Sequence, residues 1–265
     1  ADDRMGFDLE SYNDWIAHPV PGQYWDAIRV DNQVDRIQAP ALMIGGWYDY
    51  YLELMFDDFN RMITSGGSEA ARKSQIIIGP WTHESVSQFE DVDFGEEPAG
   101  TEPTGPVTIF VMGKNEWRNE KEWPLARTQY VKYYLHSSGR AGTSEGDGRL
   151  DTKSPESEPP DQFTYDPRNP VPSIGGTSIY GNAKPGPCDQ REIEKRSDVL
   201  VYSTPPLIEE IEVTGPVTVV LYASSSARDT DYSAKLVDVY PDGKAINLRS
   251  GMLRARYRES LEQPS

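Results

Sequence analysis

The chain has 265 residues and a formal net charge of −17, which comes from 26 basic and 43 acidic side chains. An acidic surface repels phosphate backbones and anionic lipids, so neither nucleic acid nor a membrane is an expected partner. A single cysteine, Cys188, excludes an internal disulfide framework, and no apolar run has the length of a membrane span.

Residues 1–38 are polar with interleaved aromatic side chains, and they predict a helix and loop segment that packs those aromatics into a core. The first residue is Ala1, and no signal-like apolar stretch follows it. This slightly favours a cytoplasmic location, but the location stays unknown, and export stays open because we expect the true N-terminus to lie upstream.

Residues 39–84 predict a strand, a helix and a second strand. The apolar run 41–44 ends at two glycines, and its composition is typical of a parallel strand that is covered on both faces. The second strand, 75–78, ends at Gly79 and Pro80. Between them, apolar residues at helical spacing predict an amphipathic helix: Leu52, Met55, Phe56, Phe59, Met62 and Ile63.

Two polar residues follow the ends of these strands. Asp49 comes just after the first strand and His83 just after the second. Open α/β sheets place their ligands at this edge, and an Asp followed by a His is the chain order of an α/β-hydrolase. A right-handed crossover brings both strand ends to one edge, so we expect an Asp49 oxygen about 2.6–3.2 Å from a His83 ring nitrogen.

The segment 85–105 is rich in acidic residues, glycine and proline. Carboxylates could hold a hard cation, but their spacing matches no EF-hand loop, and a solvated acidic loop is the favoured interpretation. The residues concerned are Glu90, Asp91, Asp93, Glu96 and Glu97. The three histidines lie far apart without ligand spacing, so we expect no metal site, and nothing in the chain points to a cofactor.

From Pro106 the pattern changes to short strands separated by Pro, Gly and Asn turns, which predicts an all-β domain of the sandwich or jelly-roll kind. A final alternation of Leu253, Ala255 and Tyr257 with Arg254, Arg256 and Arg258 predicts a half-buried edge strand whose arginines meet local carboxylates. The other strand candidates are 107–112, 130–135, 199–202, 217–222 and 236–240.

Several motifs resemble those of one enzyme family. Gly45-Gly46-Trp47-Tyr48-Asp49 and Gly79-Pro80-Trp81-Thr82-His83 resemble the acid and histidine motifs of the CocE/NonD acyl hydrolases, relatives of the X-Pro dipeptidyl peptidases. Segments 224–232, 234–239 and 251–258 resemble the C-terminal β-domain of the same family. The resemblance covers nearly the whole chain, and the motifs occur in the family's order.

This resemblance implies a fold class of α/β plus all-β. Residues 1–105 would be the C-terminal portion of an α/β-hydrolase domain with the end of a helical cap. Residues 106–265 would be a jelly-roll or galactose-binding-like β-sandwich, incomplete at its C-terminus. Asp49 and His83 would be the acid and base of a Ser-His-Asp triad. Tyr51 and Trp81 suggest an apolar or aromatic acyl pocket, and core packing is the equal alternative for both. Tyr51 stands where the family's α-amino ester hydrolases place an acid.

A nucleophile for this triad is missing from the expected place. Only Ser11 precedes Asp49, without glycines around it or a strand before it. The segment Gly142–Gly146 matches the pattern G-x-S-x-G, but its flanks are loops, whereas a nucleophile elbow needs a strand before the serine and a helix after it. The resemblance implies that the serine lies upstream of this chain, which by itself would be inactive.

We therefore expect the C-terminal portion of a serine hydrolase that acts on a small ester or acyl substrate and needs the N-terminal part of the same enzyme. An X-Pro dipeptidyl peptidase is the alternative within the family. A β-sandwich that binds carbohydrate or a protein partner, with a non-catalytic hydrolase remnant, is the alternative from another class. A homo-oligomer is compatible with all three.

Overall fold

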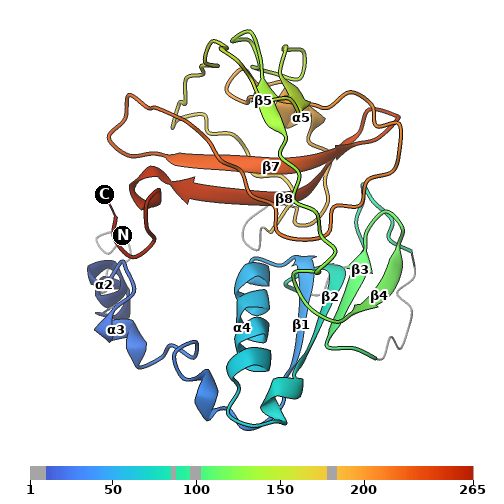
Figure 1. The fold of residues 1–265 in the computed structure, drawn as a ribbon. Helices are drawn as coiled ribbons and strands as arrows, with labels where there is room; N and C mark the ends of the chain where they lie inside the picture. Colours follow the sequence, from blue (N-terminus) through green and yellow to red (C-terminus); the bar gives the residue numbers. More distant parts are fainter. Residues whose placement is uncertain (1–9, 85–87, 96–102, 178–183, 265) are drawn as a thin grey trace.

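The structure is a computed structural model that describes residues 10–84, 88–95, 103–177 and 184–264. Figure 1 shows a lower layer built on helix α4 and strands β1–β4, and an upper part that contains strands β5, β7 and β8. Within the described ranges, every helix is too short or too polar to cross a bilayer. The segment before the sheet carries three short helices: α2 (Glu10–Ala17), α3 (Gln23–Asp26) and η1 (Val34–Arg36).

The lower layer contains a four-stranded sheet with the strand order β1-β2-β3-β4. The first three strands are parallel, and β4 runs antiparallel to β3. Helix α4 (Leu52–Ser65) and the short η2 (Ala71–Lys73) connect β1 to β2, so the predicted parallel βαβ unit is present. The strands are β1 (Leu42–Tyr48), β2 (Gln75–Thr82), β3 (Val107–Val111) and β4 (Glu116–Glu120).

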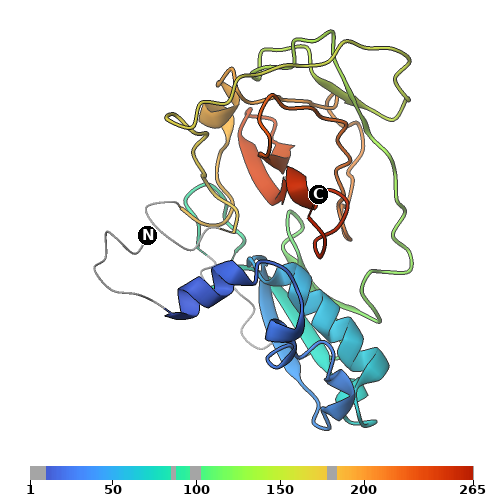
Figure 2. The same cartoon turned by 90° about the vertical axis from the view of Figure 1, so that its left-hand side faces the viewer.

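Helix α4 covers one face of this sheet, as Figure 2 shows. The predicted apolar stripe of the helix supplies Leu52, Phe56 and Phe59 to the core, and Phe59 is fully buried. The opposing side chains are Ile76 and Ile78 of β2 together with Val107, Ile109, Trp123 and Leu125. Each large apolar side chain buried here stabilises the fold by about 1.5–3 kcal/mol, so this contact fixes α4 on the strands.

Strand β1 differs from its prediction. We expect this strand to be covered on both faces. Met43 packs against the core on one face, but Leu42 and Ile44 point to the opposite face and are exposed. The physical reason is that, among the described elements, none packs over this face of β1.

The sheet also extends beyond the position where we placed the start of the all-β domain. The sequence pattern predicts that the run 107–112 belongs to that domain, but β3 pairs in parallel with β2 through Ile76↔Val107 and Ile78↔Ile109. All five residues of β3 are buried, which a central strand of an α/β sheet requires. The change in chain organisation therefore follows β4, which ends at Glu120.

Beyond β4 the chain forms two antiparallel pairs, β5–β6 and β7–β8. The candidates 199–202 and 217–222 are not strands, although isolated bridges join Leu200 to Gly142 and Ser203 to Arg149. The elements are β5 (Tyr134–His136), β6 (Arg149–Asp151), α5 (Arg191–Glu194), β7 (Asp231–Val239), β8 (Ala245–Arg254) and η3 (Ala255–Tyr257).

The predicted terminal strand is shorter than expected, because β8 ends at Arg254 and the chain turns into η3. Its three arginines do meet local carboxylates, as expected, and Arg258 lies 3.8 Å from Glu259. Arg254 forms an ion pair with Asp231 at 2.8 Å, and Arg256 forms one with Asp229 at 2.6 Å.

Strand β8 lies directly above the upper ends of β1 and α4 (Figure 1). The hydroxyl of Tyr48, at the end of β1, donates to the backbone oxygen of Asn247 in β8 at 3.3 Å. A second connection joins β4 to the segment before β7, where Arg118 donates two hydrogen bonds to Glu212. The C-terminal half of the chain is thus held against the edge of the sheet where Asp49 and His83 are found.

Candidate active site

Asp49 occupies the turn between β1 and α4. Its backbone N–H donates to the Gly46 oxygen at 3.0 Å, and its own backbone oxygen accepts from the Leu52 N–H at 3.3 Å, where α4 begins. The side chain is only 6% exposed. The Tyr51 N–H donates to Oδ1 at 2.8 Å, which fixes the carboxylate in a short side-chain turn.

His83 follows β2 in the corresponding position. Tyr48 and Thr82 are paired in the ladder, so Asp49 and His83 are the next residues of two neighbouring parallel strands. Nδ1 of His83 lies 3.1 Å from Oδ2 of Asp49, which agrees with the distance that the strand order predicted. A carboxylate in this position selects the tautomer with a proton on Nδ1 and leaves Nε2 free to accept a proton.

The other ring nitrogen faces outward. The His83 side chain is 41% exposed, and within the described residues Nε2 has no hydrogen-bond partner. The arrangement can orient an imidazole and stabilise its protonated form, but by itself it lacks a nucleophile.

Two tyrosine rings enclose the imidazole. The Tyr50 ring lies 4.6 Å from the His83 ring, and the Tyr51 ring meets it edge-on at 5.5 Å. Tyr51 is 48% exposed, so the structure brings this predicted pocket residue to the catalytic candidates and leaves a face of it open. The sequence pattern did not single out Tyr50, although its place next to Asp49 was the available signal.

Trp81, the other predicted pocket residue, lies elsewhere. It belongs to β2, where its ring lies 5.7 Å from Trp117 of β4 and directly over Gly79. None of the ring contacts found among the described residues joins Trp81 to His83. The structure therefore places Trp81 in the packing of the sheet, beside Gly46, and does not bring it to the Asp49–His83 pair.

Arg249 is a further residue at this site that the sequence pattern missed. From β8 its guanidinium donates to the backbone oxygens of Trp47 and Asp49 at 3.2 and 3.4 Å. About 200 positions separate the partners, so no local pattern could have indicated this contact. Among the described side chains of the C-terminal half, that of Arg249 reaches the backbone of the turn that carries Asp49.

The segment with the G-x-S-x-G pattern is no nucleophile elbow. Ser144 lies in a turn whose backbone N–H groups bond to Val199 and Glu194, with no strand directly before it and no helix directly after it. This agrees with the rejection made on its flanking sequence.

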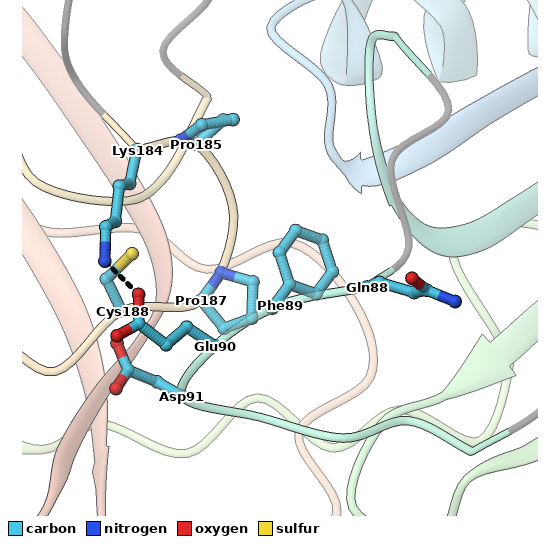
Figure 3. Close-up of a pocket in the computed structure, with 8 residues that line it drawn as sticks. All are labelled: Gln88, Phe89, Glu90, Asp91, Lys184, Pro185, Pro187 and Cys188. Carbon is cyan, nitrogen blue, oxygen red and sulfur yellow. Dashed lines mark hydrogen bonds and ion pairs between the residues drawn. The ribbon is translucent and has the colours of Figure 1, made fainter.

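Cys188 is a buried free thiol, and burial raises its pKa, which disfavours the reactive thiolate. It lines a small cavity of about 160 Å³ together with Phe89 and Pro187 (Figure 3). The Lys184 ammonium forms an ion pair with Glu90 at the rim of this cavity. Neither Asp49 nor His83 is among the residues that line this cavity.

The acidic segment makes protein contacts at each of its described carboxylates. Glu90 pairs with Lys184, Asp91 accepts from the Asp189 N–H at 3.2 Å, and Asp93 accepts from the Gly95 N–H at 2.8 Å. Glu96 and Glu97 lie outside the described residues. Within the described part of the chain, no three acidic, His or Cys side chains gather as a metal site would require.

Family models match both parts of the chain. Residues 5–85 match the X-Pro dipeptidyl-peptidase (S15 family) model, and residues 99–265 match the X-Pro dipeptidyl-peptidase C-terminal non-catalytic domain. A cocaine esterase from Rhodococcus sp. (strain MB1 Bresler) is 38% identical over 274 residues, which cover 94% of this chain and 47% of the esterase.

Solved structures show the same fold. An aminopeptidase from a marine sediment Thaumarchaeota archaeon has a TM-score of 0.74 at 22% identity, covering 100% of this chain and 48% of the aminopeptidase. An α-amino acid ester hydrolase has a TM-score of 0.68 at 22% identity, covering 97% and 48%. The chain thus spans about half the length of the curated relative and of both structures.

The two family models occur in the order in which the acid–histidine unit and the strand-rich half occur here, and the C-terminal model alone covers more than half of the residues. This chain belongs to the CocE/NonD-type family of serine ester hydrolases and X-Pro peptidases.

Proposed function

We propose that this chain provides the acid and the base of a serine acyl hydrolase that cleaves carboxylic esters. The observation that carries the proposal is the 3.1 Å contact between Asp49 and His83 at the ends of two paired parallel strands. The serine and the oxyanion hole would come from the remaining, N-terminal part of the same enzyme, as the half-length coverage of the relatives supports.

In the proposed mechanism, Nε2 of His83 accepts the proton of the serine hydroxyl as this oxygen attacks the ester carbonyl. The protonated imidazole then donates the proton to the leaving alkoxide, and a water molecule repeats the cycle on the acyl-enzyme. Asp49 stays ionised throughout and stabilises the imidazolium through Nδ1–H. Its burial and its bond from the Tyr51 N–H keep the carboxylate aimed at the ring.

We place Tyr51 in the acyl pocket, because its exposed ring lies edge-on to His83. A neutral aromatic in this position offers no carboxylate to an ammonium group, so we propose that simple aryl esters are preferred over α-amino esters. For Trp81 a pocket role has no such support, since its ring packs against Trp117. A proline-directed dipeptidyl peptidase stays the alternative within the family, in keeping with the matched models.

The finer architecture is part of this proposal. We propose that the hydrolase part extends through β4 and that the residues after it belong to a β-sandwich of the jelly-roll kind. The antiparallel pair β7–β8 and the likeness to the two solved structures support this division. A sandwich without enzymatic function is the competing interpretation, and it predicts that the whole protein has no esterase activity that depends on His83.

The test uses the whole protein with two ester substrates, phenyl acetate and phenylglycine methyl ester. We expect His83→Ala to lower kcat by on the order of 10⁴- to 10⁶-fold and Asp49→Asn by about 10⁴-fold. His18→Ala is the matched control, because the exposed His18 ring bonds to the Asp14 oxygen and stacks on Tyr24, and neither of these residues belongs to the Asp49–His83 site. Unchanged turnover in His83→Ala would disprove the catalytic role, and a strong preference for the amino ester would refute the proposed pocket.

A further inference from the structure

Arg249 connects the C-terminal half of the chain to the turn that carries Asp49. Its side chain is 25% exposed and leaves β8 toward the end of β1. Nη1 donates to the backbone oxygens of Trp47 and Asp49 at 3.2 and 3.4 Å, and Nη2 donates to Glu53 at 3.4 Å. A planar guanidinium carries five donors in fixed directions, so one arginine can hold several acceptors in a defined geometry.

The strand is irregular at this residue. In the β7–β8 ladder Leu236 pairs with Arg249 and Val237 pairs with Asn247, so the register passes over Leu248. Such a bulge redirects the side chains around it, and bulges are over-represented next to active sites. The bulge is thus a second, backbone feature at the point where β8 meets the acid-bearing turn.

Several hydrogen bonds fix the part of β8 from which Arg249 extends. Asn247 is fully buried, and its Oδ1 accepts from the Cys188 N–H at 2.8 Å and from Gln190 at 3.2 Å. Its backbone oxygen accepts the hydroxyl of Tyr48, the residue before Asp49. Residues 47, 48 and 49 therefore all bond to β8, either to Asn247 or to Arg249.

The bonds of Asp49 divide into two sets. Tyr51 and His83 hold its carboxylate, whereas Leu52 and Arg249 hold its backbone oxygen. The Tyr51 and Leu52 bonds are local to the turn and move with it. Tyr48 is also tied to β8, but Arg249 supplies the bond that ties the backbone of Asp49 itself to that strand, so its loss would let the carboxylate shift relative to His83.

We infer that Arg249 is a positioning residue for the Asp49–His83 pair. Through this residue the C-terminal half sets the geometry of the catalytic pair, although the family model that matches this half is described as a non-catalytic domain. The inference rests on the proposed function. It assigns Arg249 no contact with the substrate, because its donors reach backbone oxygens and Glu53 rather than the open face of His83.

The experiment compares Arg249→Met and Arg249→Lys with the wild type in the whole protein. Because small displacements of catalytic groups lower rates strongly, we expect Arg249→Met to reduce kcat for phenyl acetate by about 10- to 100-fold, with KM within about threefold. Lysine cannot bridge both carbonyl oxygens and should recover only part of kcat. Millimolar guanidinium should also restore part of kcat in Arg249→Met, which a purely structural role would not produce.

Arg254→Met is the matched control, since Arg254 lies on the same strand but pairs with Asp231 at the surface. Its kcat should equal that of the wild type. The inference is overturned if Arg249→Met keeps kcat within about twofold, or if its loss of activity follows thermal unfolding and guanidinium restores nothing. Should Arg249→Met not fold, full kcat in Arg249→Lys would overturn it. His83→Ala separates the two proposals, because an active His83→Ala enzyme refutes the proposed function itself.

Discussion

Gly46 lies in β1, three residues before Asp49. The structure leaves no room for a side chain at this position. A Cβ added there would lie 1.9 Å from the backbone oxygen of Trp81 and 2.5 Å from Cδ1 of its ring. The neighbouring Gly45 differs, because its added Cβ would meet the flexible end of Met55 at 2.6 Å. These adjacent glycines form a matched pair of perturbations.

The required movement in Gly46→Ala follows from these distances. Contacts below 3.0 Å are essentially never seen for Cβ atoms, so the Trp81 oxygen must withdraw by at least 1.1 Å, the difference between 3.0 and 1.9 Å. Trp81 precedes His83 by two residues, so this movement separates the two strands next to the catalytic pair. Overpacking that shifts backbone costs about 1–3 kcal/mol of stability, and a displacement of about 1 Å at catalytic groups costs about 10²-fold in rate.

The assay measures urea unfolding and kcat for Gly46→Ala, Gly45→Ala and the control Gly251→Ala, whose added Cβ has no atom within 4 Å. We expect Gly46→Ala to lose both stability and kcat, Gly45→Ala to lose less of each because Met55 can change rotamer, and Gly251→Ala to match the wild type. Equal unfolding free energies and equal kcat in Gly45→Ala and Gly46→Ala would refute the reasoning.

Two further predictions concern pH. The paired hydrogen bonds from Arg118 lower the pKa of Glu212 to about 2. This contact therefore stabilises the fold above pH ~4.3, and its contribution is lost as pH falls toward 2. After allowance for solvent screening, Glu212→Gln should lower the free energy of unfolding by about 1 kcal/mol at pH 6 and by almost nothing at pH 2. A constant difference between these pH values would contradict this. Both ring nitrogens of buried His136 face acceptors, Glu158 at 2.6 Å and the Lys153 oxygen at 2.9 Å, and the Glu158 bond raises the His136 pKa. The bond between His136 and Glu158 therefore contributes its full stabilisation below pH ~6.5, and this contribution fades as pH rises above the raised pKa. The melting temperatures of the wild type and Glu158→Gln should converge as pH rises to 9. A difference that widens with pH would refute this prediction.

The position of Asp49 and His83 could be predicted because it depends on elements that follow one another directly in the sequence. Two apolar runs joined by one amphipathic helix leave little choice of topology, and the strand ends then bring Asp49 and His83 together. Arg249 could not be found in this way. Its partners are about 200 residues away, and an arginine in a strand is ordinarily the solvated face of an edge.

The strand-rich half shows where apolar pattern fails as a guide. The run 107–112 indicates a buried strand, but nothing in it says which sheet it joins, and β3 extends the parallel sheet. The run 217–222 also has strand composition, yet its side chains are exposed and it pairs with no described strand. Composition reports that a segment can be buried, whereas pairing depends on partners that a local window does not contain.

The exposed apolar edge of β1 has a consequence for handling this chain. The edge strand of the described sheet presents Leu42 and Ile44 to solvent beside a row of backbone groups that no described strand pairs. Such an edge is a template for strand addition by another molecule, and it carries none of the lysines or prolines that usually discourage intermolecular pairing. When produced by itself, the polypeptide is therefore prone to self-association, and charged residues at positions 42 and 44 are the rational route to a monodisperse sample.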